Sequence, residues 1–122
     1  MTDRMVAAIE SGVVHCIGHP FARMFGKRDP IPLDFDRVLE ACREHHVALE
    51  ISGQPERLDL PDVYARTAAE HGVPLVVSTD AHRIDNLDYM KYGIAQARRG
   101  WVQKKHVWNT VSAVILKKRV TR

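Results

Sequence analysis

The sequence predicts an α/β fold in which crossover helices join the strands of a parallel sheet. Three short apolar segments, at residues 13–17, 47–51 and 73–77, alternate with segments whose apolar residues recur at helical spacing. The segment at 73–77 is rich in β-branched residues, as is typical of strands buried on both faces of a parallel sheet. Strands that alternate with helices form parallel sheets with right-handed connections. A length of 122 residues favours a single domain spanning residues 1–122.

The individual elements follow from these patterns and from local start and stop signals. In chain order they are a helix at 3–10, a strand at 13–17, a helix at 34–46, a strand at 47–51, a helix at 61–70, a strand at 73–77, a helix at 86–99 and a last helix at about 110–118. Thr2 is expected to cap the first helix, and Pro20 is expected to hold His19 in extended geometry. The inward side chains of the helix at 86–99 are expected to be Leu87, Met90, Ile94 and Ala97.

The third strand runs into Ser78-Thr79-Asp80-Ala81-His82, where polarity changes abruptly. Asp80 and His82 are two residues apart, so in extended backbone both side chains project to the same side. The carboxyl ends of parallel strands are where α/β folds hold their chemistry, and carboxylates and imidazoles are ligands for divalent metals. The alternative is that Asp80 caps the next helix and that His82 is a surface loop residue.

Two further side chains stand near the ends of the other strands. Gly18-His19-Pro20 places a metal-capable imidazole after the first strand. His15 lies about 13 Å back along that strand, which favours a core position over a ligand role. Glu50 is expected to face a polar cavity or to be paired, because a buried carboxylate without a partner is costly.

Positive charge is concentrated in two places. The loop at 21–33 carries Arg23, Lys27 and Arg28, which could hold a phosphate or simply be solvated. Residues 98–122 include eight Lys or Arg and no Asp or Glu, whereas the remaining 97 residues carry ten basic and fifteen acidic side chains. This basic end is either a solvated surface or an electrostatic footprint for a polyanion such as nucleic acid.

Cysteine usage and hydropathy bear on the location of the chain. Cys16 and Cys42 form no CxxC or zinc-ribbon spacing, and nothing points to secretion, so reduced thiols in the cytoplasm are expected. No apolar run approaches the roughly 20 residues that a membrane span needs, so no membrane partner is expected.

Five motifs occur in a characteristic order. They are Gly18-His19-Pro20, Leu49-Glu50-Ile51, Arg57-Leu58-Asp59-Leu60, Ser78-Thr79-Asp80-Ala81-His82, and Tyr92-Gly93 through Ala97-Arg98-Arg99-Gly100-Trp101. In order and spacing they resemble the C-terminal half of the PHP (polymerase and histidinol phosphatase) domain. The greatest likeness is to the PHP domain of bacterial family X DNA polymerases, and it covers nearly the whole chain.

The resemblance implies half of a distorted (β/α)₇ barrel, with a cluster of divalent metals (Mn²⁺, Zn²⁺ or Mg²⁺) at the carboxyl ends of the strands. His19, Asp80 and His82 match metal ligands of the family, and Glu50 is expected to orient a ligand without binding metal itself. Arg23 matches a family arginine. The expected contacts to phosphate or DNA are Arg23, Arg28, Arg57, Lys104 and Lys105.

The chain also departs from the family pattern. Phe21-Ala22 stands where the family has Thr-Gly, and Ser52-Gly53-Gln54 stands where it has Asn-Ala-Asn. The opening His-x-His motif and the other early ligands have no counterpart here, so we expect a partial PHP domain that binds metal weakly and has little or no activity alone.

The function expected from the resemblance is that of a phosphoesterase portion. The chain would be part of the 3′–5′ exonuclease of a family X DNA polymerase, acting on DNA during repair. Two alternatives are a non-catalytic DNA-binding or oligomerising remnant and a histidinol-phosphatase-like enzyme for small phosphoesters.

A half-barrel also predicts self-association. Its strands are expected to leave an apolar surface and open sheet edges uncovered, with Val14, Leu49, Ile51, Leu75 and Val77 as the candidate surface residues. A homodimer would cover such surfaces most simply.

Overall fold

The computed structural model describes residues 1–121 and has the predicted α/β architecture. Its elements, with η for 3₁₀-helices, are α1 (Thr2–Glu10), β1 (Cys16–Ile17), α2 (Phe35–His45), β2 (Ala48–Ser52), α3 (Asp62–Glu70), β3 (Leu75–Ser78), η1 (Ile84–Tyr89), α4 (Met90–Arg99), η2 (Lys104–His106), η3 (Trp108–Thr110) and α5 (Ala113–Val120). The three strands are parallel in the order β1-β2-β3, as predicted. No helix among these residues is long and apolar enough to cross a membrane.

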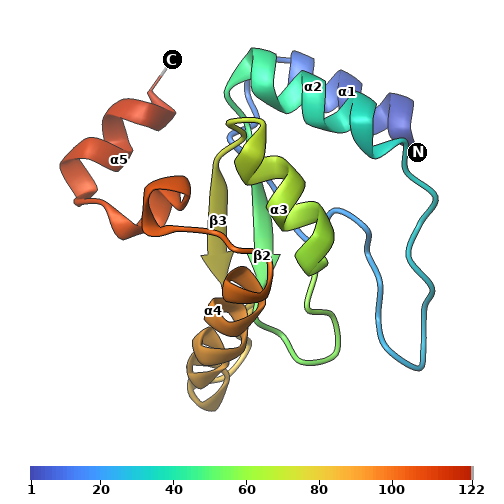
Figure 1. Ribbon diagram of the computed structural model, residues 1–122, viewed down its shortest axis with the longest axis vertical. Helices are drawn as coiled ribbons and strands as arrows, with labels where there is room; N and C mark the ends of the chain where they lie inside the picture. Colours follow the sequence, from blue (N-terminus) through green and yellow to red (C-terminus); the bar gives the residue numbers. More distant parts are fainter. Residues whose placement is uncertain (122) are drawn as a thin grey trace.

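The helices are distributed unevenly around the sheet. Figure 1 shows α3 in front of β2, while α1 and α2 lie side by side near the ends where the strands begin. The carboxyl ends of β2 and β3 point toward α4, and α5 stands apart from the sheet (Figure 1). Helix α4 packs closely, since a Cβ added at Gly93 would lie 2.8 Å from Cγ1 of Val77. The candidate site therefore lies at the end of the sheet near α4.

The apolar face of the sheet is covered, which corrects one expectation. Leu49 pairs in register with Leu75, and Ile51 pairs with Val77, so the four side chains share one face. The first three are 0% exposed and Val77 is 6% exposed, because this face packs against helices. The prediction that these four residues form an uncovered surface is wrong. Val14 is only partly buried and packs against the same core.

The opposite face is more polar and only partly buried. Its residues of intermediate exposure are Cys16, Glu50, Val76 and Ser78. Ala48 and Ser52 of β2 lie on the same face and are 0% exposed. The strand at 73–77 was expected to be buried on both faces, and β3 is buried only on alternate residues. A one-residue difference in parity exchanges the two faces of a strand, which is why the sequence did not fix which one is covered.

The outer edge of β3 is also closed. Val107 forms a parallel bridge with Leu75. The Asn109 side chain accepts a hydrogen bond from the Val77 N–H at 3.1 Å and donates one to the Val77 carbonyl at 2.6 Å. An amide side chain thus takes the place of a neighbouring strand, and the prediction of an open edge is wrong at β3.

Several element ends differ from the sequence prediction. The first strand contains two residues rather than five, and Val13 is 79% exposed. Met1, not Thr2, is the N-cap of α1; the Thr2 hydroxyl instead accepts a hydrogen bond from the Asp34 N–H at 2.9 Å. The helix expected from residue 34 begins at Phe35, and Asp34 is its N-cap, accepting from the Arg37 N–H at 3.3 Å. These polar contacts join the starts of α1 and α2.

The predicted helix at 86–99 divides into η1 and α4. Leu87 lies on η1 and is 61% exposed, and Ile94 on α4 is 44% exposed, so their expected inward positions are wrong. The buried positions of α4 are Gly93, Gln96 and Ala97. The expected inward positions of Met90 and Ala97 are confirmed, since Ala97 is buried and Met90 packs against the core. The change from 3₁₀ to α geometry before α4 explains why Leu87 does not continue the same face.

Candidate functional site

The turn after β1 places His19 beside the second strand. The His19 N–H donates to Oε1 of Glu50 at 2.7 Å, and its Nδ1 lies 3.8 Å from the same oxygen. His19 has φ of +27°, so the extended geometry expected before Pro20 is wrong. Phe21, two residues further on, anchors the turn, with its ring centroid 4.7 Å from that of Tyr64. Backbone and side chain of His19 are therefore held at the mouth of the sheet.

Glu50 connects the ends of all three strands. It lies in β2, its side chain is 16% exposed, and its second oxygen, Oε2, accepts a hydrogen bond from the Ser78 hydroxyl of β3. With the bond from His19, the carboxylate is satisfied on both oxygens. Of the two alternatives expected for Glu50, a polar cavity or a partner, the structure shows partners, and Ser78 as one of them was not anticipated. Its proposed role in orienting His19 is consistent with this position.

Asp80 and His82 follow β3 in a sharp bend. Strand β3 ends at Ser78, and Asp80 has φ of +51°, so these residues are not in extended backbone and the geometric argument for a shared side fails. The exposed His82 ring places Nδ1 2.8 Å from the Asp80 carbonyl oxygen, and the His82 N–H donates to Oδ1 of Asn86 at 3.2 Å. The alternative in which Asp80 caps the next helix is wrong, since Arg83 is the N-cap of η1 and no side chain caps it.

Arg57 reaches the Asp80 carboxylate from the loop between β2 and α3. Its Nε lies 4.0 Å from Oδ2 of Asp80, and the two side chains are 14% and 32% exposed. Arg23 holds the same loop, because its Nε donates to the Arg57 carbonyl at 2.7 Å and its NH2 donates to the Leu58 carbonyl. One predicted phosphate contact, Arg57, therefore lies next to a predicted metal ligand, and a second, Arg23, holds the loop that carries Arg57.

A buried carboxylate, that of Asp59, holds the backbone of the turn that follows His19. Asp59 is 0% exposed and accepts hydrogen bonds from the Phe21 N–H at 3.3 and 3.0 Å. Burial raises the pKa of Asp59, and the Phe21 N–H and the Arg23 charge oppose that rise. Sequence reasoning missed this role, although the charged residue between Leu58 and Leu60 is a signal that could have found it.

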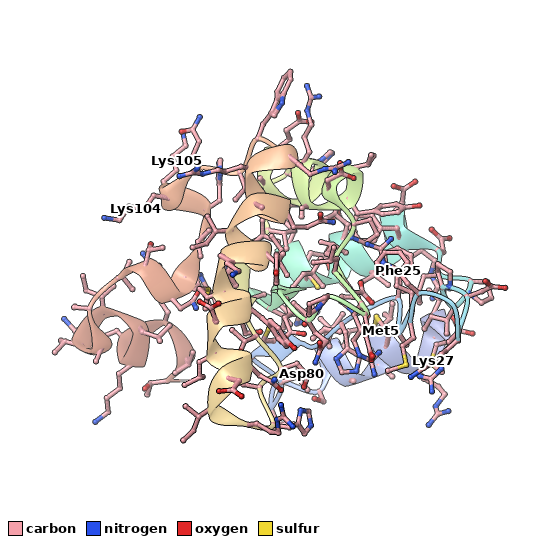
Figure 2. The ribbon with its side chains drawn as sticks, turned by 90° about the horizontal axis from the view of Figure 1, so that it is seen from below. Met5, Phe25, Lys27, Asp80, Lys104 and Lys105 are labelled. Atoms are coloured by element: carbon pink, nitrogen blue, oxygen red, sulfur yellow. The ribbon has the colours of Figure 1, made fainter. Side chains whose placement is uncertain are left out.

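The remaining predicted contacts lie in two separate regions. Arg28 belongs to an exposed turn at 24–28. Figure 2 shows Lys104 and Lys105 on one side of α4, and Phe25 and Lys27 with Asp80 on the other. Lys105 lines a cavity of about 650 Å³ whose lining does not include Asp80. Lys104 and Lys105 therefore lie away from Asp80, on the other side of α4.

The donor atoms suit a divalent metal, but their arrangement is incomplete. Among residues 1–121, no group of three or more His, Cys, Asp or Glu side chains is placed to hold a metal ion. Glu50 is occupied by two hydrogen bonds and Asp80 faces a guanidinium. His19, Asp80 and His82 thus do not form a metal site by themselves in this part of the chain, and their ligand role stays a prediction.

Comparisons with known proteins place the chain. It is 41% identical over 109 residues, or 89% of its length, to "DNA polymerase/3'-5' exonuclease PolX" of Bacillus subtilis. It is 45% identical over 51 residues to "Probable phosphatase YcdX" of Escherichia coli, and 32% identical over 82 residues to "Probable histidinol-phosphatase" of Deinococcus radiodurans. The chain is related to the PHP proteins.

This relationship confirms the resemblance read from the motifs. No family model matches the chain. The PHP-related chain spans 19% of PolX, 18% of the phosphatase and 32% of the histidinol-phosphatase. The names of the whole proteins therefore describe molecules several times longer than the matched segments.

Proposed function

We propose that the chain is a portion of a PHP-type phosphoesterase, and that the whole protein is the 3′–5′ exonuclease of a family X DNA polymerase that acts in DNA repair. The observation that carries the proposal is the match to PolX over 89% of the chain. Local geometry supports it, because Glu50 ties the His19 turn to Ser78 at the end of β3, just before Asp80. These are the positions at which a phosphoesterase of this family needs ordered ligands.

The chain's own residues would bind and orient the substrate. Arg57 lies next to Asp80, and Arg23 is bonded to the backbone of the Arg57 loop. Arginine forks suit phosphate oxygens, so these two side chains would fix the phosphodiester while Glu50 keeps His19 in place. Divalent metal, when bound, would supply the activated water. Because the described residues do not complete a metal site, no hydrolytic step is assigned to them alone.

Two assays test the proposal. The isolated chain, incubated with 3′-labelled single-stranded DNA and Mn²⁺, is expected to release little or no nucleotide. A chimera in which this chain replaces the matching segment of Bacillus PolX is expected to keep chelator-sensitive 3′–5′ exonuclease activity. In that chimera Asp80→Ala should abolish the exonuclease, whereas Arg83→Ala, an exposed neighbour, should not. Polymerase activity reports that the polymerase part of the chimera is folded, and an unfolding midpoint close to that of wild-type PolX reports that the exchanged segment is folded.

The outcomes separate the alternatives. A chimera that polymerises but cannot degrade DNA contradicts the exonuclease proposal, and salt-dependent DNA binding without hydrolysis then favours the non-catalytic remnant. Hydrolysis of small phosphate monoesters but not of DNA favours the histidinol-phosphatase alternative. Robust, chelator-sensitive degradation by the isolated chain contradicts the expected inactivity.

Self-association and a cytoplasmic location complete the proposal. The surfaces that now support a homodimer differ from those first expected: α5 has no buried residue, and its Val114 and Ile115 are 67% and 46% exposed. An apolar helix side that stands apart from the sheet is covered most simply by a second copy of the chain. Free Cys16 and Cys42 accord with a reducing compartment.

A further inference from the structure

A tight turn after β1 presents an aromatic ring to solvent. The turn closes through hydrogen bonds from the Met24 N–H to the Arg28 carbonyl at 2.9 Å and from the Arg28 N–H to the Met24 carbonyl at 2.8 Å. Gly26 has φ of +76°, a conformation that glycine adopts without strain. Phe25 precedes it and is 54% exposed. A large apolar side chain at the tip of an exposed turn has no role in the core.

The ring of Phe25 is held in position by the loop beside it. Arg23 Cζ lies 4.7 Å from the ring centroid, a cation–π distance. Arg23 is fixed by its bonds to the carbonyls of Arg57 and Leu58, and the Phe25 N–H donates to the Glu56 carbonyl at 2.7 Å. An aromatic side chain ordered in advance loses little conformational entropy when it binds a flat ligand.

A series of side-chain and backbone contacts leads from the Phe25 ring to the candidate site. Arg57 donates back to the Arg23 carbonyl at 3.4 Å and lies 4.0 Å from Asp80 on its other side. Phe25, Arg23, Arg57 and Asp80 therefore form a continuous strip, which we call the Phe25 strip. Figure 2 shows Phe25 and Asp80 on the same side of α4.

Two exposed cations stand next to the ring. Lys27 and Arg28 line a cavity of about 470 Å³ together with Arg23 and Phe25. Acidic groups offset part of this charge: Asp29 lines the same cavity, and Glu56 lies 4.0 Å from Lys27. That ion pair is open to solvent, with side chains 66% and 55% exposed, so it holds Lys27 only weakly and the lysine can exchange partners.

We propose that Phe25 is a stacking platform for a base of single-stranded DNA, with Lys27 and Arg28 contacting the flanking phosphates. Aromatic rings bind the faces of all bases, and adjacent cations follow the backbone. The strip then directs the strand from the turn toward Asp80. The path of the strand toward Asp80 rests on the proposed function, whereas base stacking on Phe25 does not.

Trp101 provides a matched comparison. It is 69% exposed and also lies under an arginine, with Arg66 Cζ 3.7 Å from its ring centroid. Its arginine belongs to α3 and pairs with Glu70 rather than with the site loop. A third exposed ring, Tyr92, has Lys91 Nζ 5.2 Å from its centroid. Of these three rings, Phe25 is the one whose cation is bonded to the loop that carries Arg57.

The test measures binding of a fluorescent oligothymidylate of about eight nucleotides to the full chain in EDTA, where hydrolysis cannot contribute. Phe25→Ala is expected to weaken binding about 5- to 150-fold, the loss equivalent to one stacked base. Phe25→Trp should retain affinity, and Trp101→Ala should leave it unchanged. An oligonucleotide of abasic residues should bind wild type and Phe25→Ala equally.

Salt dependence separates stacking from charge. Each phosphate contact adds about −0.7 to the slope of log affinity against log salt for single strands. Lys27→Ala and Arg28→Ala should each reduce the slope by about 0.7, whereas Phe25→Ala should leave it unchanged. Equal affinity of wild type and Phe25→Ala, or an equal loss in Trp101→Ala, overturns the proposal, as does failure of the wild type to bind. Exonuclease activity of the chimera is a separate readout, so either proposal can fail without the other.

Discussion

Removal of the Glu50 carboxylate is expected to destabilise the chain at the candidate site. The substitution Glu50→Ala deletes the acceptor for the His19 N–H and for the Ser78 hydroxyl. Hydrogen bonds to a charged group contribute about 1.5–3 kcal/mol each, so full loss of both would cost about 3–6 kcal/mol. The His19 side chain is 41% exposed and the region can be rehydrated, which lowers the expected cost to about 2–4 kcal/mol. Glu50→Gln keeps one good acceptor and should cost about half as much.

Urea unfolding followed by far-ultraviolet circular dichroism measures this cost. For a chain of this size, a loss of 2–4 kcal/mol lowers the midpoint by on the order of 1–2 M. Glu44→Ala, at an exposed carboxylate on α2, is the matched control and should change stability by no more than about 0.5 kcal/mol. Ser78→Ala combined with Glu50→Ala should cost little more than Glu50→Ala alone, since both remove the same bond. A Glu50→Ala protein as stable as the control would refute the reasoning that this carboxylate joins the strand ends.

Three further predictions concern packing, cysteine reactivity and assembly. Gly53→Ala would place a methyl group 2.3 Å from the Tyr89 carbonyl oxygen and should lower the free energy of unfolding, measured in urea, by at least about 1–3 kcal/mol. In the control Gly18→Ala the new methyl group meets only an ordinary 3.6 Å contact, so the free energy of unfolding should fall by less. Burial raises the pKa of the Cys16 and Cys42 thiols to about 12, so at pH 8 only about one thiol in 10⁴ is ionised to thiolate. Ellman's reagent should therefore label both cysteines slowly in the native chain and rapidly in urea. Fast labelling of the native chain would contradict this prediction. Light scattering across a concentration series should give a mass above the monomer, and a constant monomer mass at about tens of micromolar would exclude the dimer.

The order and type of the elements could be predicted because their signals are local. Apolar runs and helical spacing depend on neighbouring residues, and so do the Asp34 cap and the stop at Gly100. The motifs around His19, Glu50 and Asp80 also identified the family before any geometry was known, and the match to PolX confirmed that relationship. For the site, the sequence predicted that Glu50 is either paired or turned to a polar cavity, since an isolated buried carboxylate is costly.

Only the tertiary structure decided which surfaces are covered and which site residues meet. Strand parity is fixed by what packs against the sheet, so Leu49 and Leu75 proved buried although their spacing also fits the opposite face. Asn109 closes the β3 edge from 32 residues away, a contact that no local pattern contains. The left-handed backbone at Asp80 removes the simple two-residue geometry, and the fold separates Lys105 from Asp80. The sequence by itself determined the family, the elements and the chemical groups, because these depend on composition and local order. Their mutual positions depend on long-range packing, which is decided only when the whole chain folds.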